Sequence, residues 1–159
     1  MNTILGCSSR MRSHTDIDLV FQSFQGRQKK FNWLITDFEC YPSEALGSCE
    51  TKPLWFTGEQ LTEIVSKQRI QFVWAVLSGF DPNTTINPNS LEVEPRAEGH
   101  PTVWTERPTI QHPNAKVEII CCDSTFTILL SQDNDLSLRF RNFFPEATDL
   151  DEYNAASGE

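Results

Sequence analysis

The sequence is poor in the residues that build metal sites and common catalytic centres. It has only three histidines and no Cys-x-x-Cys pair, whereas structural zinc sites draw several such ligands from a narrow spacing. It also lacks the glycine-rich loops that cradle phosphates or dinucleotides, and the Gly-x-Ser-x-Gly elbow of many hydrolases. The residues therefore predict no metal, no cofactor and no catalytic group of a known motif.

Long apolar runs are also missing, and no stretch reaches the length of a membrane span. The five cysteines are odd in number and have no paired spacing, so we expect free thiols in a cytoplasmic protein rather than a disulfide framework. A bridge between Cys40 and Cys49 is the one pairing that the spacing leaves open.

Basic residues are scarce beyond the first thirty positions. Residues 1–30 hold five bases and two acids, whereas residues 31–159 hold eight bases and twenty acids, within a net charge of -9 for the whole chain. A field of this sign repels nucleic acid and anionic membranes, and it speeds encounter with basic proteins. The charge balance favours a basic protein partner, although plain solubility would produce the same excess.

The 159 residues suit a single core, and the eleven phenylalanines and four tryptophans are enough to fill it. We predict one α+β domain over residues 14–153, with a mainly antiparallel sheet and about three helices. Residues 1–13 read as a loose lead-in, and residues 154–159 as a flexible tail or cloning remnant.

Hydrophobic periodicity predicts the elements of this domain. Helices are expected from about residue 17, after a cap at Ser13 or Thr15, to Gly26, from the capping-box pair Thr57 and Gln60 to about 68, and over 136–147. Strands are expected over 31–38, 70–77, 91–94, 102–106 and in two runs within 117–131 that meet near Asp123. Trp74 lies in the middle of the most apolar strand and is predicted to be almost fully buried.

Candidate binding residues are acids that share a strand face, and aromatics that lie near them. Asp37 and Glu39 are two apart on one extended segment, and Glu92 and Glu94 on another, so each pair shares a face. Asp123 falls at a predicted turn, where aspartate is also favoured by turn chemistry alone. An aromatic beside carboxylates is a common anchor in protein interfaces. The aromatic candidates are Tyr41, Trp55 and Trp104, with core packing as the alternative for both tryptophans.

In overall form and in several short sequence segments, the chain resembles bacterial immunity proteins of contact-dependent growth inhibition and related polymorphic toxin systems. These segments are Trp33-Leu34-Ile35-Thr36-Asp37-Phe38-Glu39, Gly58-Glu59-Gln60-Leu61, Phe72-Val73-Trp74-Ala75-Val76, Cys122-Asp123-Ser124-Thr125 and Phe144-Pro145-Glu146-Ala147-Thr148-Asp149-Leu150.

This resemblance implies stoichiometric binding of a cognate toxin's C-terminal domain in the cytoplasm. Many such toxins are nucleases with basic surfaces for phosphate, so an acidic inhibitor would imitate the charge of the nucleic acid. Two alternatives stay open: an adaptor or regulatory domain unrelated to toxins, and a small hydrolase that uses Asp37 and Glu39 as paired carboxylates. The sequence leaves self-association, the toxin activity and the position of the interface open.

Overall fold

The computed structural model describes residues 1–11, 15–47 and 52–157, which form a seven-stranded sheet with helices against it. The strand order is β3-β2-β4-β5-β6-β1-β7, and every neighbouring pair runs antiparallel. The strands are β1 (Thr3–Leu5), β2 (Asn32–Tyr41), β3 (Leu54–Thr57), β4 (Gln71–Phe80), β5 (Val117–Cys122), β6 (Phe126–Ser131) and β7 (Thr148–Asp149). The helices are α1 (Ile17–Ser23), the 3-10 turn η1 (Arg27–Lys30), α2 (Gly58–Lys67), α3 (Asn134–Phe143) and α4 (Leu150–Ser157). The predicted α+β class with an antiparallel sheet is confirmed.

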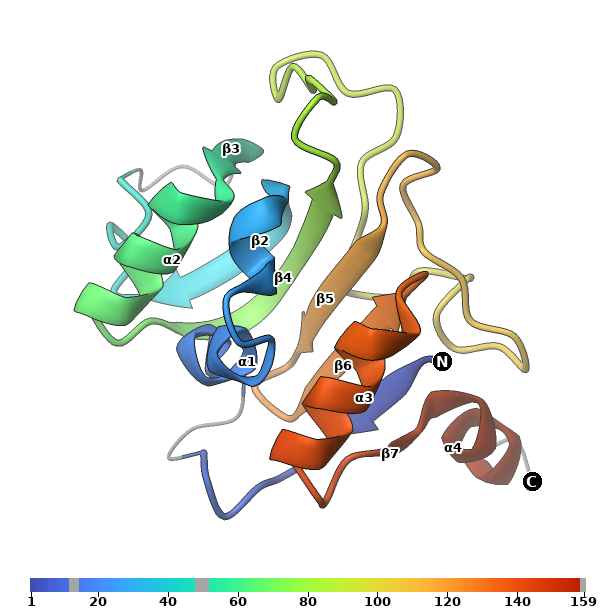
Figure 1. Cartoon of the computed structure of the whole chain (residues 1–159). Helices are drawn as coiled ribbons and strands as arrows, with labels where there is room; N and C mark the ends of the chain where they lie inside the picture. Colours follow the sequence, from blue (N-terminus) through green and yellow to red (C-terminus); the bar gives the residue numbers. More distant parts are fainter. Residues whose placement is uncertain (12–14, 48–51, 158–159) are drawn as a thin grey trace.

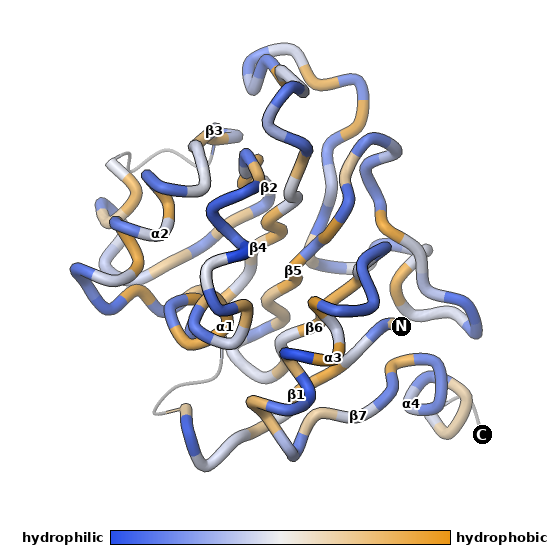
Figure 2. The backbone as a smooth tube through the Cα atoms, viewed as in Figure 1, coloured by the Kyte–Doolittle hydropathy of each residue, from blue (hydrophilic) through white to orange (hydrophobic). Residues whose placement is uncertain are grey.

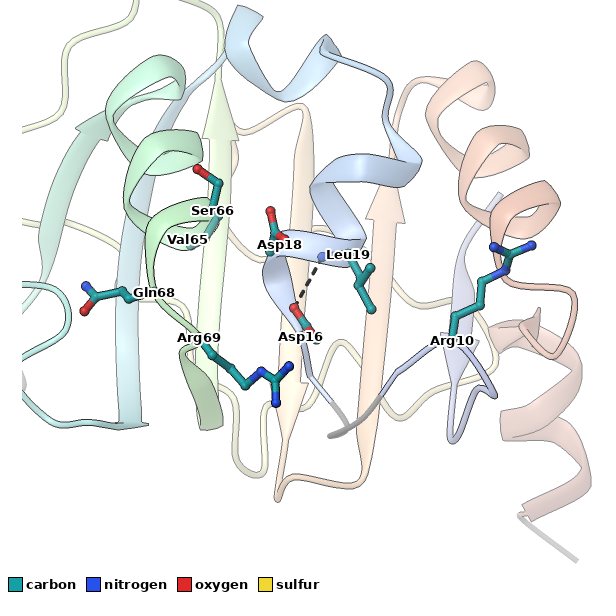
Figure 3. A pocket seen from close by; sticks show the side chains of 8 residues that line it. All are labelled: Arg10, Asp16, Asp18, Leu19, Val65, Ser66, Gln68 and Arg69. Atoms are coloured by element: carbon teal, nitrogen blue, oxygen red, sulfur yellow. Dashed lines mark hydrogen bonds between the residues drawn. The ribbon is translucent and has the colours of Figure 1, made fainter.

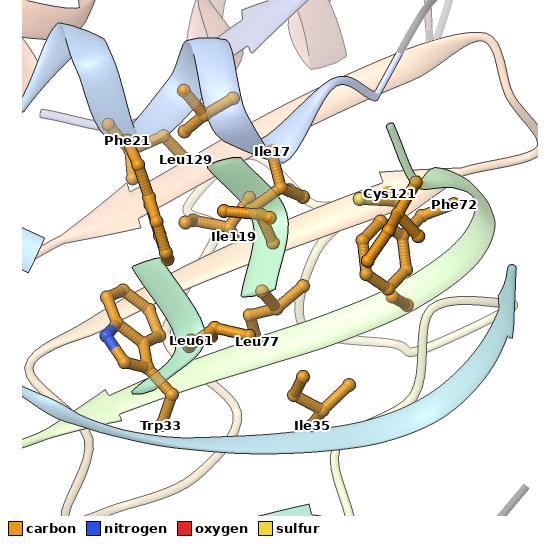
Figure 4. Close-up of a cluster of buried hydrophobic side chains, with 14 of the residues drawn as sticks. Ile17, Phe21, Trp33, Ile35, Leu61, Phe72, Leu77, Ile119, Cys121 and Leu129 are labelled. Atoms are coloured by element: carbon orange, nitrogen blue, oxygen red, sulfur yellow. The ribbon is translucent and has the colours of Figure 1, made fainter. Parts of the chain in front are cut away.

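Helices α1, α2 and α3 cover one face of the sheet, while α4 lies beside β7 near the C-terminus (Figure 1). Alternate residues of the central strands, among them Leu77, Ile119 and Leu129, point into this helical side, as a period of two requires. Phe21 of α1, Leu61 of α2 and Trp33 of β2 meet them in the main core (Figure 4).

The predicted capping box of α2 is present. The Thr57 hydroxyl accepts from the Gln60 backbone N–H at 3.2 Å, and the Gln60 side chain accepts from the Thr57 backbone N–H at 2.9 Å. At α1 the cap is Asp16, whose carboxylate accepts from the Leu19 N–H at 3.3 Å. The predicted cap Thr15 is therefore wrong, and Ser13 lies outside the described residues. Asp16 takes the position because Thr15 has a positive φ of 66° and its hydroxyl donates to the Phe72 carbonyl instead.

The second face of the sheet is covered by the long connection from Asp81 to Lys116, which forms no helix or strand. Val76, Ile120 and Leu130, which alternate with the helix-facing residues, pack there against Ala97 and Val103 of the connection. Figure 2 shows hydrophobic residues concentrated along the central strands, with the connection more hydrophilic. A segment of this length without secondary structure is uncommon in a compact domain and is often functional.

The strands predicted over 91–94 and 102–106 are absent, because both segments belong to this connection. Val103 is buried and Leu91 is half-buried because both lie on the sheet face, not because they join the sheet. One-sided burial gives the same alternation as a half-exposed strand, so the pattern could not separate the two. The prediction that Trp74 is almost fully buried is also wrong. Trp74 is only half-buried, because the connection covers its end of the sheet incompletely.

Both chain ends contain more structure than predicted. Thr3, Ile4 and Leu5 of the expected lead-in are buried as β1, between β6 and β7. A strand of three residues is too short to show a period. Residues 154–157 of the expected tail belong to α4, whose first turn is capped by the Asp149 carboxylate, at 2.9 Å from the Asp151 N–H.

Candidate functional site

Two adjoining hollows lie where the connection crosses the end of the sheet, and they share Trp74 and Glu98. One, of about 360 Å³, lies between the β2 end and residues 94–98 of the connection. The other, of about 410 Å³, lies between residues 97–104 and the β5–β6 turn. We call them together the acidic groove. Its defining residues are Asp37, Glu39, Glu94, Glu98, Asp123, Trp74 and Trp104.

The groove therefore brings together five of the eight predicted binding residues, from three separate parts of the sequence. Tyr41 lies at its margin, because its hydroxyl donates to Glu39 Oε1 at 3.1 Å. This hydrogen bond raises the pKa of Tyr41. Trp55 and Glu92 line neither hollow: Trp55 packs on the Phe80 ring at 5.5 Å, and Glu92 is exposed farther along the connection.

Asp37 holds residues 94–98 of the connection, which form one wall of the groove. It lies at a register shift of β2 with a φ of 45°, and its Oδ2 accepts from the Ala97 N–H at 2.7 Å and the Glu98 N–H at 3.4 Å. Aspartate tolerates this left-handed backbone better than most side chains. The adjacent Thr36 hydroxyl donates to the Pro95 carbonyl at 2.7 Å, so two consecutive residues of β2 anchor the connection.

Asp123 is placed by the β5–β6 hairpin. Asp123 and Ser124 have φ values of 48° and 52°, and the Thr125 N–H donates to the Cys122 carbonyl at 2.8 Å, as in a turn of type I′. The Ser124 N–H then donates to the Val73 carbonyl at 3.0 Å, which holds the turn beside β4. The Asp123 side chain stays exposed at the groove end.

Aromatic surface is exposed at both ends of the groove. Tyr41 is 59% exposed and Trp104 is 42% exposed, and both are among the four exposed large hydrophobic residues of the described chain. Trp104 rests against the rings of Phe126 and Tyr153, with centroids 6.4 and 6.5 Å away. Because the ring is supported from behind, one part of it stays fixed and open to a partner.

The charges of the groove are not neutralised by ion pairs within the described residues. The ion pairs found there join η1, α2 and α3, as in Arg27–Asp135 at 2.9 Å and Lys29–Glu59 at 3.0 Å. None involves a carboxylate of the groove, and Arg96, which lies between Glu94 and Glu98 in sequence, lines neither hollow. No three groove acids converge tightly enough in the described chain to hold a metal ion. The arrangement is suited to an extended basic segment.

A third hollow, of about 370 Å³, lies between α1 and α2 and mixes both signs of charge (Figure 3). Arg10, Arg69, Asp16 and Asp18 line it. Burial raises the pKa of Asp16, while its bond to the Leu19 N–H and the nearby Arg69 act in the opposite direction. Three of these groups already have partners within the chain: Asp16 caps α1, Asp18 accepts from the Gln22 side chain, and Arg10 lies over the Phe143 ring. The acidic groove is therefore the stronger candidate.

Sequence reasoning missed Glu98 and misplaced Trp74. Glu98 lies in a segment without periodicity, and no local pattern marks it. The apolar neighbours Phe72, Ala75 and Val76 predict burial of Trp74, and all three of these neighbours are fully buried.

Four of the five cysteines lie within the described residues. Cys7, Cys40, Cys121 and Cys122 are free thiols, whereas Cys49 lies outside the described residues. Burial raises the pKa of Cys122 to about 12, so this thiol at the groove floor is a poor nucleophile. In the described part of the chain, no helix is both long and apolar enough to cross a membrane.

Comparisons with protein families, curated proteins and solved structures found no match.

Proposed function

We propose that the protein binds a basic partner protein through the acidic groove and neutralises a toxin domain, in the immunity role that the sequence resemblance implies. One observation carries the proposal: five carboxylates without an ion pair in the described chain surround two hollows that also expose tryptophan. In this role the protein works in the cytoplasm of the cell that it protects.

The groove offers a basic side chain two kinds of contact. A guanidinium or ammonium group placed near Trp74 or Trp104 can lie on an aromatic face and meet a carboxylate, and both contacts strengthen when water is displaced. A nuclease needs such basic groups to hold phosphate. If carboxylates of the groove bound these groups, they would block the substrate site. Electrostatic complementarity of this kind also raises the association rate.

A charge-reversal pair tests the groove. Glu94→Lys with Glu98→Lys alters two exposed side chains of the groove, whereas Glu92→Lys with Asp151→Lys makes the same change of net charge outside it. Stopped-flow mixing with a hexa-arginine peptide, followed by tryptophan fluorescence, should show about tenfold or greater loss of association rate for the first pair, in line with the range of electrostatic steering. The second pair should stay close to the unmodified protein. Equal losses in both would refute a groove-specific contact.

The toxin role has its own test. The gene directly upstream should encode a large secreted protein with a variable C-terminus, and co-expression of this protein should rescue growth from that C-terminal domain. Peptide binding without such a neighbour or rescue would retain the groove as a binding site and reject the immunity role in favour of an adaptor.

A further inference from the structure

A second carboxyl group, Glu118, lies inside the molecule and holds the long connection against the sheet. It has no exposed surface and projects from β5 toward the second sheet face, opposite Ser78 of β4. Its two oxygens accept from the Ser78 hydroxyl at 3.0 Å, the Gln111 N–H at 2.8 Å and the His112 N–H at 3.0 Å. Two consecutive amides of the connection thus end on one buried carboxyl group.

Gln111 carries this attachment on to the groove wall. Its side chain accepts from the Arg96 N–H at 2.7 Å and donates to the Arg96 carbonyl at 3.0 Å. The next residue, Ala97, is the one that Asp37 holds, and Ala97 and Glu98 line the groove. A continuous set of hydrogen bonds therefore runs from Glu118 through Gln111 and Arg96 to the groove.

Among the described residues, no cation forms an ion pair with Glu118. Ser78 faces it from β4, and Leu130 is its partner on β6. From the connection it meets Gln111 and His112, and the His112 ring lies edge-on to Phe80 at 4.8 Å, with its pKa lowered by burial. Lys116, two residues earlier in the chain, forms no ion pair with Glu118 among the described residues. Burial raises the pKa of Glu118 to about 7, against the opposing effect of its three hydrogen bonds.

We infer that Glu118 is a proton-controlled latch, which sets how firmly the connection holds its wall of the acidic groove. The latch itself follows from the hydrogen bonds above, while its effect on partner binding rests on the proposed function. Between pH 4.5 and 7, Glu118 holds a proton while residues 109–113 lie on the sheet, and it releases that proton to water when they lift off; above pH 7 the carboxyl group is ionised in both states.

The direction of the effect follows from proton linkage. The closed state binds the proton with a pKa of about 7, whereas an exposed glutamate has its ordinary value of 4.5. Protonation of Glu118 therefore stabilises the closed connection fully below pH 4.5, and this stabilisation is lost as the pH rises from 4.5 through 7. Between these values the opening constant should increase up to about tenfold per pH unit, and above pH 7 it should level off.

Amide hydrogen exchange of the whole protein, measured by NMR between pH 5 and 8, tests the latch. Protection factors, which already correct for intrinsic exchange, should fall with pH at Gln111, His112 and Arg96, and level above pH 7. The Gln60 amide, which donates to its own helix cap, should not follow them. In Glu118→Gln the pH dependence of the three amides should vanish. Flat profiles in the unmodified protein, or unchanged slopes in Glu118→Gln, would overturn the proposal.

Two milder variants keep the test decisive if Glu118→Gln folds poorly. Ser78→Ala removes a donor that favours the ionised form, so the levelling should move to higher pH. Gln111→Ala should remove the pH dependence at Arg96 while preserving it at His112, whereas the distant Gln22→Ala should change neither. A carboxyl carbon of Glu118 that titrates near 4.5 by NMR would refute the latch whatever the variants show.

Binding of the hexa-arginine peptide at pH 6 and 8 separates the latch from the proposed function. Affinity should be several-fold weaker at pH 8 in the unmodified protein and nearly equal in Glu118→Gln, a comparison that also removes any contribution of His100, whose pKa burial lowers. No binding at either pH would reject the groove as a binding site and leave the exchange result intact. Binding that ignores pH, together with pH-dependent exchange, would refute the coupling between the latch and the groove.

Discussion

At the scale of single residues, the acids of the groove have different roles: one anchors the connection and others are exposed to a partner. Asp37 is turned toward the backbone of the connection, while Glu39, Glu94 and Glu98 extend exposed side chains. The pairing of Asp37 with Glu39 on one strand face, which the sequence predicted, is interrupted by the register shifts between Thr36 and Cys40. Both acids line the same hollow, but Asp37 anchors the connection whereas Glu39 is presented to solvent.

Two substitutions at Asp37 should separate these duties. Asp37→Ala removes the acceptor of the Ala97 N–H and places a less tolerant side chain at a φ of 45°, so it should lower the free energy of unfolding by about 1–3 kcal/mol. Asp37→Asn keeps an acceptor and the backbone preference, and should lose well under half of that. Urea denaturation measures both. Equal losses in the two variants would show that charge, rather than the hydrogen bond, is what matters.

At the scale of elements, α2 is positioned by a close approach as much as by its cap. A Cβ on Gly58 would lie 2.5 Å from the Gln28 carbonyl oxygen, 2.6 Å from the Lys29 Cα and 2.6 Å from the Phe31 carbonyl oxygen. All three atoms belong to the backbone around η1, so none can turn aside. Glycine at this position lets the first turn of α2 rest directly on η1.

Gly58→Ala should therefore lower the free energy of unfolding by about 1–3 kcal/mol, as overpacking does, despite the better helix propensity of alanine. Ser66→Ala is the matched control, because Ser66 is exposed on the same helix and only its hydroxyl bonds to the Glu63 carbonyl. It should change stability by less than about 0.5 kcal/mol. Thermal unfolding followed by circular dichroism measures both variants, and an alanine at 58 that stabilises the protein would refute the close contact.

At the scale of the whole molecule, the two sides differ in how their charges are used. Four acids on the helical side form ion pairs with bases of η1, α2 and α3, whereas those of the groove form none within the described residues. The four are Glu59, Glu63, Asp133 and Asp135. The net charge of -9 thus understates the negative field at the groove. Long-range attraction should be directed there rather than spread evenly.

Salt should reveal this direction. Raising the ionic strength from 0.01 to 0.15 M shortens the screening length from about 30 to about 8 Å, so association with the hexa-arginine peptide should slow markedly. The groove reversal of Glu94 and Glu98 should flatten this dependence far more than the control reversal of Glu92 and Asp151, although both change the net charge equally. Stopped-flow fluorescence provides the rates. Identical salt slopes in the two variants would attribute the attraction to net charge alone.

The sequence by itself determined the class of the fold and most of its regular elements. The capping box of Thr57 and Gln60, the aromatic strand from Trp33 and the paired strands after Val117 were all readable, because each depends on neighbours within one turn or one strand. Glu118 falls within a strand that the sequence predicted, but only the structure shows that this strand is buried along its whole length.

Only the tertiary structure decided where these residues act. The connection from Asp81 to Lys116 is held by scattered side chains, among them Asp37, Gln111 and Glu118, rather than by a repeating backbone pattern. Its path therefore left no period in the sequence. That path sets the exposure of Trp74, unites Glu39 with Glu94 and Glu98, and excludes Trp55 and Glu92. Local periodicity specifies elements, whereas a groove depends on contacts between residues far apart in the chain, which no local pattern records.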